Sequence, residues 1–574
     1  MQKLTRFLKP YTSKIGLILV LLFFQMLGTL YIPTLTANIV NSGILVGDIQ
    51  VVLQIGGIML GVALLTALVS VWGTYLSTRV ATGVATDIRK SLFEKVQILS
   101  YDEFNQFGAA SLITRSTGDI TQIQQTLSII VEMLLPAPFI ALTGLLLAFS
   151  KSAQLGLIIL VVMVIILVVA AFLTVKVIPI FEDMQTSMDH INSKVRENFI
   201  GVRVIRAFNR TAEEKQSADN FFADYANASI KSSKIFAIML PLIMGIMNFC
   251  TVLILWFGGK QVVGGVMEIG DIMAVIEYAM FILMYLVMAV MAFMMIPRAQ
   301  TSANRINEVL NITPEISVMD MEKKAADQLP LIEFEDVSFY YQGSEEPAIS
   351  DISFSVKKGE TVAIIGGTGS GKSSIANLLL RFYDISEGSI RIDGEDVQSI
   401  PEQVLRENIG YVPQKAFLFS GTIGENLRHG KRDATEEEMH QATAIAQIDD
   451  FINETEKGLE TPVSQGGNNF SGGQKQRLAI ARAIIKKPSI LVFDDSFSAL
   501  DAATDVRLRE ALKKDTGDRA VIIIAQRISS IMDADQIIVL DNGRVVGKGR
   551  HEELMKNCEE YREIANSQLG GETA

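Results

Sequence analysis

The sequence predicts a polytopic α-helical membrane domain followed by an α/β domain with a phosphate-binding loop. Hydrophobic residues make up 49% of the 574 residues, and the mean hydropathy of +0.32 exceeds that of an ordinary soluble protein. Long apolar runs are confined to the part before Pro297, whereas short strand-like runs alternate with helical patterns after Leu331. We therefore expect one part of the chain to lie in lipid and the other in water.

Six apolar runs in the first part are long enough to cross a bilayer, because about 20 apolar residues span the hydrocarbon. They lie roughly at residues 15–40, 51–78, 127–149, 153–178, 235–258 and 272–297. The first run is longer than a signal peptide needs, and no short apolar core with a small-residue cleavage site precedes it. We expect it to remain as a membrane anchor.

The distribution of Lys and Arg predicts how these helices are oriented. Four cations precede the first run and four follow the second, whereas the connection NSGILVGDIQ between them has none. Six cations follow the fourth run, and the short connection FSKSAQ before it carries one. Both termini and the α/β domain are therefore expected in the cytoplasm of a cell whose membrane holds the chain.

Two long polar links, roughly 79–126 and 179–234, keep a helical spacing of apolar residues and contain few Gly or Pro. They are expected to be helices that continue beyond the bilayer, and the alternative is that they are solvated connectors. The N-terminal LTRFLKPY suits an interfacial helix or the end of the first spanning helix. The predicted domains are a membrane domain at 1–310, a linker at 311–330 and a soluble domain at 331–574.

Charge and cysteine usage exclude two classes of protein. The net charge of -12 argues against a nucleic-acid partner, because a phosphate-binding surface needs clustered Lys and Arg. The only two cysteines, Cys250 and Cys558, fall in an apolar run and in the soluble tail, so we expect both to be reduced and no disulfide framework.

The segment GGTGSGKSS follows the strand pattern TVAII and precedes the helical pattern SIANLLLRF, which is the context of a phosphate-binding loop. Its backbone N–H groups and helix N-terminus attract phosphate, Lys372 reaches the phosphate oxygens, and Ser373 is placed to ligate Mg²⁺. Asp494, at the end of ILVF, is placed for the same magnesium shell. The predicted nucleotide residues of this loop are Gly366, Gly367, Thr368, Gly369, Ser370, Gly371, Lys372, Ser373 and Ser374.

Further along, FSGGQ opens a basic amphipathic helix, and read alone it is only a helix cap with a tight turn. The order of phosphate loop, FSGGQ, paired acids and SALD resembles the ATP-binding-cassette domain. With six preceding spans, nearly the whole chain resembles a half-transporter of the ABC exporter family. The resemblance implies an ATPase that uses ATP and Mg²⁺. It also implies a second subunit, because in that family the signature caps ATP bound on the opposite domain; here its residues are Ser471, Gly472, Gly473 and Gln474.

The same resemblance assigns three more positions. Tyr341 matches the aromatic that stacks on adenine, and Gln414, in YVPQ, matches the glutamine that senses magnesium and couples to the membrane domain. SALD, residues 498–501, matches the loop that touches the partner's site. Without the resemblance, Tyr341 reads as an edge-strand aromatic and Gln414 as a plain loop residue.

The chain departs from the family pattern at two catalytic positions and before the signature. Asp495 stands where the family has a catalytic glutamate, and Gln526 stands where it has a switch histidine. A carboxylate withdrawn by one methylene, about 1.5 Å, misplaces the base that orients water, and an error of about 1 Å can cost about 100-fold. TPVSQGGNNFSGGQ also lacks the usual acidic stretch. The two catalytic departures, with the intact signature, predict a heterodimer in which this chain's own site is weak and its signature completes a competent site; the alternative is a homodimer in which aspartate suffices.

The substrate is less visible in the sequence. Met280, Met284, Met288, Met291 and Met295 form one helical stripe, which suits either a promiscuous apolar surface or ordinary packing. Glu132 and Glu277 are acids within apolar runs, where they are costly in lipid and are expected to face a cavity or a helix end. Export of hydrophobic or cationic amphiphilic drugs is the favoured prediction. Lipid flipping and an ATP-gated regulatory subunit are the alternatives.

Overall fold

The computed structural model describes residues 2–293, 295–313 and 330–569, which form two compact units. The first unit comprises Met1–Gln97 and Gly108–Ile312, and the second comprises Ile98–Phe107 and Thr313–Ala574. Most of the predicted linker, 311–330, lies outside the described residues.

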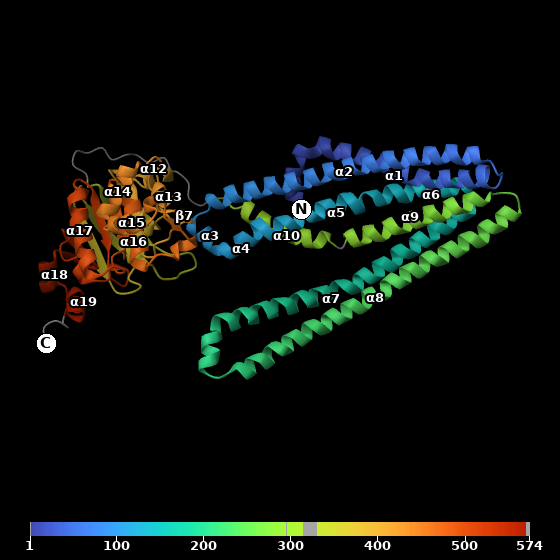
Figure 1. The fold of residues 1–574 in the computed structure, drawn as a ribbon. Helices are drawn as coiled ribbons and strands as arrows, with labels where there is room; N and C mark the ends of the chain where they lie inside the picture. The colour runs from blue at the N-terminus through green and yellow to red at the C-terminus, as the bar shows by residue number, and fades with distance from the viewer. Residues whose placement is uncertain (1, 294, 314–329, 570–574) are drawn as a thin grey trace. The chain divides into compact units, whose positions relative to one another are not determined.

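The first unit consists of long helices (Figure 1). Within its described residues, six helical segments are long and apolar enough to span a membrane, and each of the six predicted apolar runs overlaps one of them. The segments are Leu4–Ile44, Ile49–Gln97, Ala109–Lys151, Ala153–Phe172, Thr211–Val263 and Ile269–Leu310. The individual elements are η1 (Gln2–Tyr11), α1 (Thr12–Asn38), η2 (Ile39–Ile44), α2 (Ile49–Gln97), α4 (Ala109–Thr114), η3 (Arg115–Asp119), α5 (Ile120–Ile129), η4 (Ile130–Leu134), α6 (Pro136–Lys151), α7 (Ala153–Ala207), α8 (Thr211–Val263), α9 (Ile269–Phe293) and α10 (Ile296–Leu310).

The predicted helical character of the long polar links is confirmed. Helix α7 has 55 residues and α8 has 53, so each continues well past the apolar stretch that crosses a bilayer. The two run side by side (Figure 1). Ser152 caps the start of α7 by accepting a hydrogen bond from the Leu155 backbone N–H at 3.4 Å. Elements η2, η3 and η4 are π-helical turns.

The apolar core of the first unit joins α1, α6, α7, α8 and α9. Two polar contacts lie at this core. The buried Tyr278 hydroxyl lies 2.6 Å from the Thr34 hydroxyl, and Lys151 pairs with Asp271 at 2.7 Å. Because a hydroxyl or charge left without a partner in lipid is costly, these contacts fix α9 against α1 and α6.

In residues 330–569, a mostly parallel sheet of six strands has the order β12-β11-β3-β10-β9-β6, and only β12 is antiparallel to its neighbour. The predicted strands TVAIIGG, SILVFDD, AVIIIAQ and QIIVLDNG are β3, β9, β10 and β11, so the predicted α/β class is confirmed. An antiparallel sheet of order β2-β1-β4-β5 and the short pair β7-β8 complete the strands described here. The strands are β1 (Ile332–Phe339), β2 (Ile349–Val356), β3 (Thr361–Gly366), β4 (Glu387–Ile392), β5 (Glu395–Asp396), β6 (Ile409–Val412), β7 (Gly421–Thr422), β8 (Pro462–Val463), β9 (Ile490–Asp494), β10 (Ala520–Ile524), β11 (Gln536–Asp541) and β12 (Arg544–Gly549).

Helices of the second unit are anchored on these sheets by two apolar clusters. They are α3 (Tyr101–Phe107), α11 (Lys372–Leu379), α12 (Glu402–Glu407), α13 (Ile423–Arg428), α14 (Glu436–Ile445), α15 (Asp449–Glu454), η5 (Gly458–Glu460), η6 (Gln465–Gly467), α16 (Gly472–Ile484), α17 (Ala502–Thr516), η7 (Ile528–Ser530), α18 (His551–Asn557) and α19 (Glu559–Leu569). Helix α3 belongs here because the Tyr101 ring stacks on Phe382 at 6.1 Å and meets Tyr383 edge-on at 5.8 Å. Cys250 and Cys558 are both free and buried.

Candidate nucleotide-binding site

The candidate site lies at the carboxyl ends of four neighbouring parallel strands. The loop GGTGSGKSS follows β3, Gln526 follows β10, Asp494 ends β9, and Gln414 follows β6. Ligands of open α/β sheets bind at such an edge, because loops from adjacent strands meet there. The fold thus brings together residues that lie up to about 160 positions apart in the chain.

Glycines shape the phosphate loop. Gly369 and Gly371 have φ of +84° and +93°, a left-handed region that glycine enters at little cost. A Cβ on Gly366 would lie 2.1 Å from the Leu540 carbonyl oxygen, and one on Gly371 would lie 2.6 Å from the Ala348 carbonyl oxygen. The loop therefore packs tightly against its neighbours and leads directly into the N-terminus of α11, where backbone N–H groups favour an anion.

Lys372 is held inside this loop. Its Nζ donates to the carbonyl oxygens of Gly366 at 2.8 Å and Gly367 at 2.5 Å, and to the Ser370 hydroxyl at 3.3 Å. Burial lowers the pKa of Lys372, while the nearby carboxylates of Asp495 and Asp494 raise it. The ammonium group is thus fixed where a phosphate would meet the loop.

Ser373 and Asp494 form the oxygen-rich corner of the site. The Ser373 hydroxyl donates to Asp494 Oδ1 at 3.2 Å, and the Asp494 side chain is buried. Burial raises the pKa of Asp494, and the hydrogen bond from Ser373 opposes that rise. A hydroxyl beside a carboxylate is an oxygen donor set of the kind that Mg²⁺ prefers, so these two side chains fit the ion.

Gln414 and Asp495 meet because their strands pair in register. Strand β6 runs parallel to β9 with Val412 opposite Phe493, so the residues two positions further on lie side by side. Gln414 Nε2 donates to Asp495 Oδ2 at 3.1 Å. The Asp495 backbone N–H donates to the Ile524 carbonyl oxygen at 2.8 Å and fixes this acid beside β10.

Gln526 is exposed directly after β10, and its carbonyl oxygen accepts a hydrogen bond from Gln568 Nε2 at 2.7 Å. Helix α19 thus fixes the backbone at Gln526. Tyr341 is half-buried at the other side of the loop, where its hydroxyl lies 3.0 Å from the Ser374 hydroxyl. Its ring meets the edges of Phe339 and Tyr383. The roles of Gln526 and Tyr341 toward nucleotide remain predictions.

The signature segment is a well-formed helix start. Ser471 Oγ accepts from the Gln474 backbone N–H at 3.3 Å, and the Ser471 N–H donates to Gln474 Oε1 at 2.8 Å. This capping box begins α16, and Ser471 and Gly472 are both exposed. The exposed helix N-terminus offers donors to an anion outside this unit.

The SALD loop follows the paired acids and is tied to them. The Ser498 hydroxyl donates to the Asp495 carbonyl oxygen at 2.8 Å. Asp501 caps α17 by accepting from the Thr504 backbone N–H at 3.0 Å, a bond that lowers the pKa of Asp501. Asp501 therefore has a clear structural role within its own chain.

Two residues with contacts at the site were not predicted from the sequence. Tyr411 donates a hydrogen bond to Asp494, and burial raises the pKa of Tyr411. Gln476, buried in α16, donates to the Pro413 carbonyl oxygen at 3.1 Å and so connects the signature helix to the loop of Gln414. The hydroxyl of Tyr411 in an otherwise apolar strand could have indicated a polar contact at the site. The sequence around Gln476 carries no such signal.

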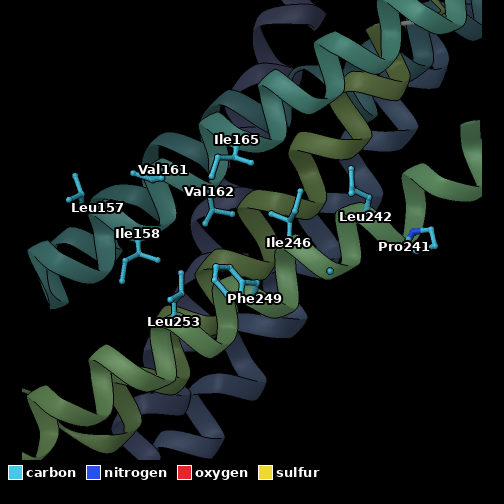
Figure 2. A pocket seen from close by; sticks show the side chains of 11 residues that line it. Leu157, Ile158, Val161, Val162, Ile165, Pro241, Leu242, Ile246, Phe249 and Leu253 are labelled. Carbon is cyan, nitrogen blue, oxygen red and sulfur yellow. The ribbon is translucent and has the colours of Figure 1, made fainter.

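The first unit contains an apolar pocket of about 690 Å³ between α7 and α8 (Figure 2). Its lining is aliphatic and aromatic, with Val161 and Ile165 on α7 and Leu242 and Phe249 on α8. Elsewhere in this unit Glu277 is half-buried on α9, and Glu132 is exposed on the π-helical turn η4. Of the methionine stripe, Met295 lies beyond the end of α9, at the start of α10.

Comparison with known proteins agrees with this division. The family model described as ABC transporter transmembrane region matches residues 15–309, and the model described as ABC transporter matches residues 349–498. An uncharacterized ABC transporter ATP-binding protein of Mycobacterium tuberculosis is 39% identical over 98% of this chain and 97% of its own length. The uncharacterized ABC transporter ATP-binding protein YfiB of Bacillus subtilis is 38% identical over 100% of this chain and 99% of its own.

Among solved structures, a bacterial Atm1-family ABC exporter with ATP bound superposes with a TM-score of 0.81 at 25% identity, covering 98% of this chain and 99% of the other. The ATP-binding domain of this family uses ATP with Mg²⁺ and couples its hydrolysis to transport, and its exporters are dimeric. The chain belongs to the ABC transporter family, as an exporter that carries its transmembrane and ATP-binding domains in one polypeptide.

Proposed function

We propose that this chain is one half of a heterodimeric exporter that moves hydrophobic or cationic amphiphilic compounds out of the cytoplasm. In this proposal its own ATP site binds nucleotide but hydrolyses it slowly, and its signature segment completes the productive site of a different subunit. Both termini and the ATP-binding domain lie in the cytoplasm. The observation that carries the proposal is the identity and placement of Asp495.

Asp495 directly follows Asp494, and it occupies the position of the family's catalytic glutamate. Its side chain is one methylene shorter than glutamate, and one of its oxygens already accepts the hydrogen bond from Gln414. A base that orients water must reach it at hydrogen-bond distance, so a shorter carboxylate held back by Gln414 is a poor base. Gln526, where the family has histidine, donates a hydrogen bond but carries no charge.

The remaining residues of the site are suited to binding. Lys372 and the N-terminus of α11 offer positive potential to phosphate, and Ser373 and Asp494 offer oxygen ligands to Mg²⁺. Bound Mg²⁺ would neutralise phosphate charge in this corner. A complete set of binding residues beside a weak base supports a site that binds ATP but hydrolyses it slowly.

The exposed signature supports the second half of the proposal. Ser471 and Gly472 lie at the free N-terminus of α16, with the capping box intact. Donors aimed at a phosphate stabilise the charge that develops during its transfer. In a dimer of this family the signature faces the partner's nucleotide, so this chain supplies that group to the partner.

The apolar character of the membrane unit supports the substrate class. The pocket between α7 and α8 is aliphatic and aromatic (Figure 2). Glu277 is half-buried on α9. Apolar surfaces with few polar groups bind lipophilic compounds with little selectivity, and an acid in a membrane helix favours cationic ones.

The decisive experiment compares two variants of this chain in the assembled complex. Asp495→Asn is expected to lower steady-state ATP hydrolysis by less than about 10-fold, because the carboxylate it removes is poorly placed. Ser471→Ala is expected to lower it further, because it removes a donor from the partner's productive site. Phosphate release at saturating Mg²⁺ and ATP is measured for both, with fluorescent-nucleotide binding as the control for intact sites. Equal damage by the two variants would show that this chain's own site is catalytically competent.

The substrate class has its own test. Glu277→Gln is expected to reduce export of permanently cationic dyes more than export of neutral ones, because the lost carboxylate acts in a medium of low dielectric. Glu268→Gln, an exposed acid in the turn before α9, is the matched control. Dye accumulation in inside-out vesicles measures both classes. An equal loss for cationic and neutral dyes would place Glu277 outside the route, and ATPase stimulation by lipid alone would favour lipid flipping.

A further inference from the structure

A second pocket in the first unit, of about 350 Å³, lies between the N-terminal helix η1 and helix α2. Unlike the pocket between α7 and α8, it is lined by polar groups. The threonines at 78, 82 and 86 contribute hydroxyls, and Arg79 and Asp87 contribute opposite charges. The proposed function does not use this pocket.

The sequence of α2 places the pocket at the membrane surface. Residues 49–78 contain no Asp, Glu, Lys or Arg, and Arg79 is the first charged residue of the helix. Trp72 and Tyr75, which lie within two helical turns before Arg79, are both more than half exposed. Aromatic side chains gather where hydrocarbon meets headgroups, and cations follow on the aqueous side. The pocket therefore lies at the level of lipid headgroups.

The N-terminal helix forms one wall of the pocket. A Cβ on Gly83 would lie 2.5 Å from the Tyr11 hydroxyl oxygen, so the glycine lets Tyr11 approach α2 closely. The Tyr11 hydroxyl donates to Asp87 Oδ2 at 3.0 Å. Lys14 lies 5.5 Å from the Tyr11 ring centroid. The hydrogen bond from Tyr11 fixes the Asp87 carboxylate at the aqueous end of the pocket.

The Arg79 side chain lies at the opposite end of the pocket. The Arg79 guanidinium lies 5.4 Å from the Tyr75 ring centroid, and among the described residues it forms no ion pair. Arg79 and Asp87 are two helical turns apart, about 12 Å along α2. Arg79 is therefore nearer the hydrocarbon and Asp87 nearer water, with Thr82 and Thr86 between them.

This order of charges matches one kind of lipid headgroup. In phosphatidylethanolamine the phosphate is attached close to the acyl chains, and the primary ammonium group extends toward water. We propose that the pocket binds the headgroup of such a phospholipid, with its phosphate at Arg79 and its ammonium group at Asp87. Arg79 binds phosphate through charge-assisted hydrogen bonds, and Asp87 accepts the N–H donors that a quaternary ammonium lacks. A purely anionic lipid fits less well because Asp87 would repel it.

An apolar track leads from the pocket into the membrane. Leu68, Trp72 and Tyr75 are spaced at four and three residues, so they share one face of α2 with Arg79. All three side chains are more than half exposed. An acyl chain of a lipid held at Arg79 would lie along this face. The site is independent of the heterodimer proposal, because all of its residues belong to the first unit of one chain.

Trp72 provides the readout. The sequence has two tryptophans, Trp72 and Trp256, so the Trp256→Phe variant reports from the track alone. The full-length variant is placed in phosphatidylcholine nanodiscs that contain a minor fraction of lipid brominated on its acyl chains. Brominated phosphatidylethanolamine is expected to quench Trp72 at several-fold lower mole fraction than brominated phosphatidylcholine. Equal quenching by these two lipids, or stronger quenching by brominated phosphatidylglycerol than by either, would overturn the assignment.

Three further variants separate the roles of the two charges. Arg79→Gln is expected to weaken quenching by brominated phosphatidylethanolamine and by brominated phosphatidylcholine alike, by roughly 10-fold, because both headgroups carry the phosphate. Asp87→Asn is expected to bring phosphatidylethanolamine to the level of phosphatidylcholine. Lys90→Gln removes an exposed cation further along the same helix and should leave the preference unchanged. A preference retained in Asp87→Asn, or quenching left unchanged by Arg79→Gln, would refute the site.

Soluble phosphoethanolamine distinguishes a lipid site from a site for the free headgroup. Added at millimolar concentration, it is expected to leave the quenching by brominated phosphatidylethanolamine unchanged, because the acyl track contributes to binding. Full displacement by the soluble compound would mean that the pocket does not require a lipid. Size-exclusion profiles and thermal melting verify that each variant is folded.

Discussion

Asp495 adopts a backbone conformation that most residues avoid. Its φ is +46°, in the left-handed region, where Asp and Asn are several-fold enriched among residues other than glycine. The short side chain that weakens the base is thus one that this backbone tolerates well. Restoring glutamate at this position would lengthen the carboxylate while placing a less suited residue in a left-handed turn.

Alanine substitutions at two glycines of the phosphate loop are expected to have different effects on stability. Gly371→Ala is expected to lower the apparent melting temperature of the nucleotide-free protein, because a left-handed alanine costs about 1–2 kcal/mol. The added Cβ would also clash with the Ala348 carbonyl oxygen. Gly367→Ala is the matched control: φ at Gly367 is not left-handed and a Cβ there meets nothing within 4 Å. Thermal melts of both variants decide; equal destabilisation would contradict this account of the loop.

At the level of single residues, spacing in the sequence located Lys372, Ser373 and Asp494, and the structure brings these side chains together. The spacing in the sequence did not predict the hydrogen bond between Gln414 and Asp495, which are 81 residues apart. That bond depends on β6 pairing beside β9 in a particular register. Register between distant strands is set by packing of the whole sheet, and hydrophobic pattern alone does not specify the neighbour.

Whole helices and strands could be predicted from the sequence where their hydrophobic pattern is long. The six spanning segments and the strands β3, β9, β10 and β11 follow directly from apolar runs. The π-helical turns η2, η3 and η4 were not predicted, because one extra residue in a turn barely changes the pattern of side chains. Such turns re-aim the residues after them, and η4 carries Glu132 while η3 carries Asp119.

The contact between η3 and α10 can be tested at this scale. Asp119 is buried and accepts hydrogen bonds from the Ser302 hydroxyl at 2.8 Å and from Arg305 at 2.5 Å. Asp119→Asn is expected to cost about 1–2 kcal/mol, because the ion pair is lost and Arg305 is partly exposed to solvent. The apparent melting temperature should fall by about 2–8 °C.

The control for this element is Glu94→Gln. Glu94 lies 3.9 Å from Lys90 on α2, and both side chains are mostly exposed. An exposed pair of this kind contributes about 0–1 kcal/mol, so melting should change little. If Glu94→Gln destabilised the protein as much as Asp119→Asn, burial would not be the reason for the effect.

For the whole molecule, the proposed function predicts how the chain behaves without a different partner. The purified chain is expected to bind ATP but to turn it over at less than about 1 per second, because every site it forms contains Asp495 and Gln526. Nucleotide binding and phosphate release are measured on the same preparation, and Lys372→Ala corrects for contaminating ATPases. Turnover of tens per second by the pure chain would remove the case for a heterodimer.

The length of helix α7 has a mechanical consequence. Its 55 residues extend over about 80 Å of helix, with Pro179 inside it and α8 along its side. From Ala153 to Pro179 the helix is about 40 Å long, and a tilt of about 5° at one end of this stretch moves its other end by about 3.5 Å. A change in side-chain packing of about an ångström at a pivot can therefore become a displacement large enough to open or close a passage for a small molecule. This stretch acts as a lever whose gain is set by the number of residues that the helix spans before the proline.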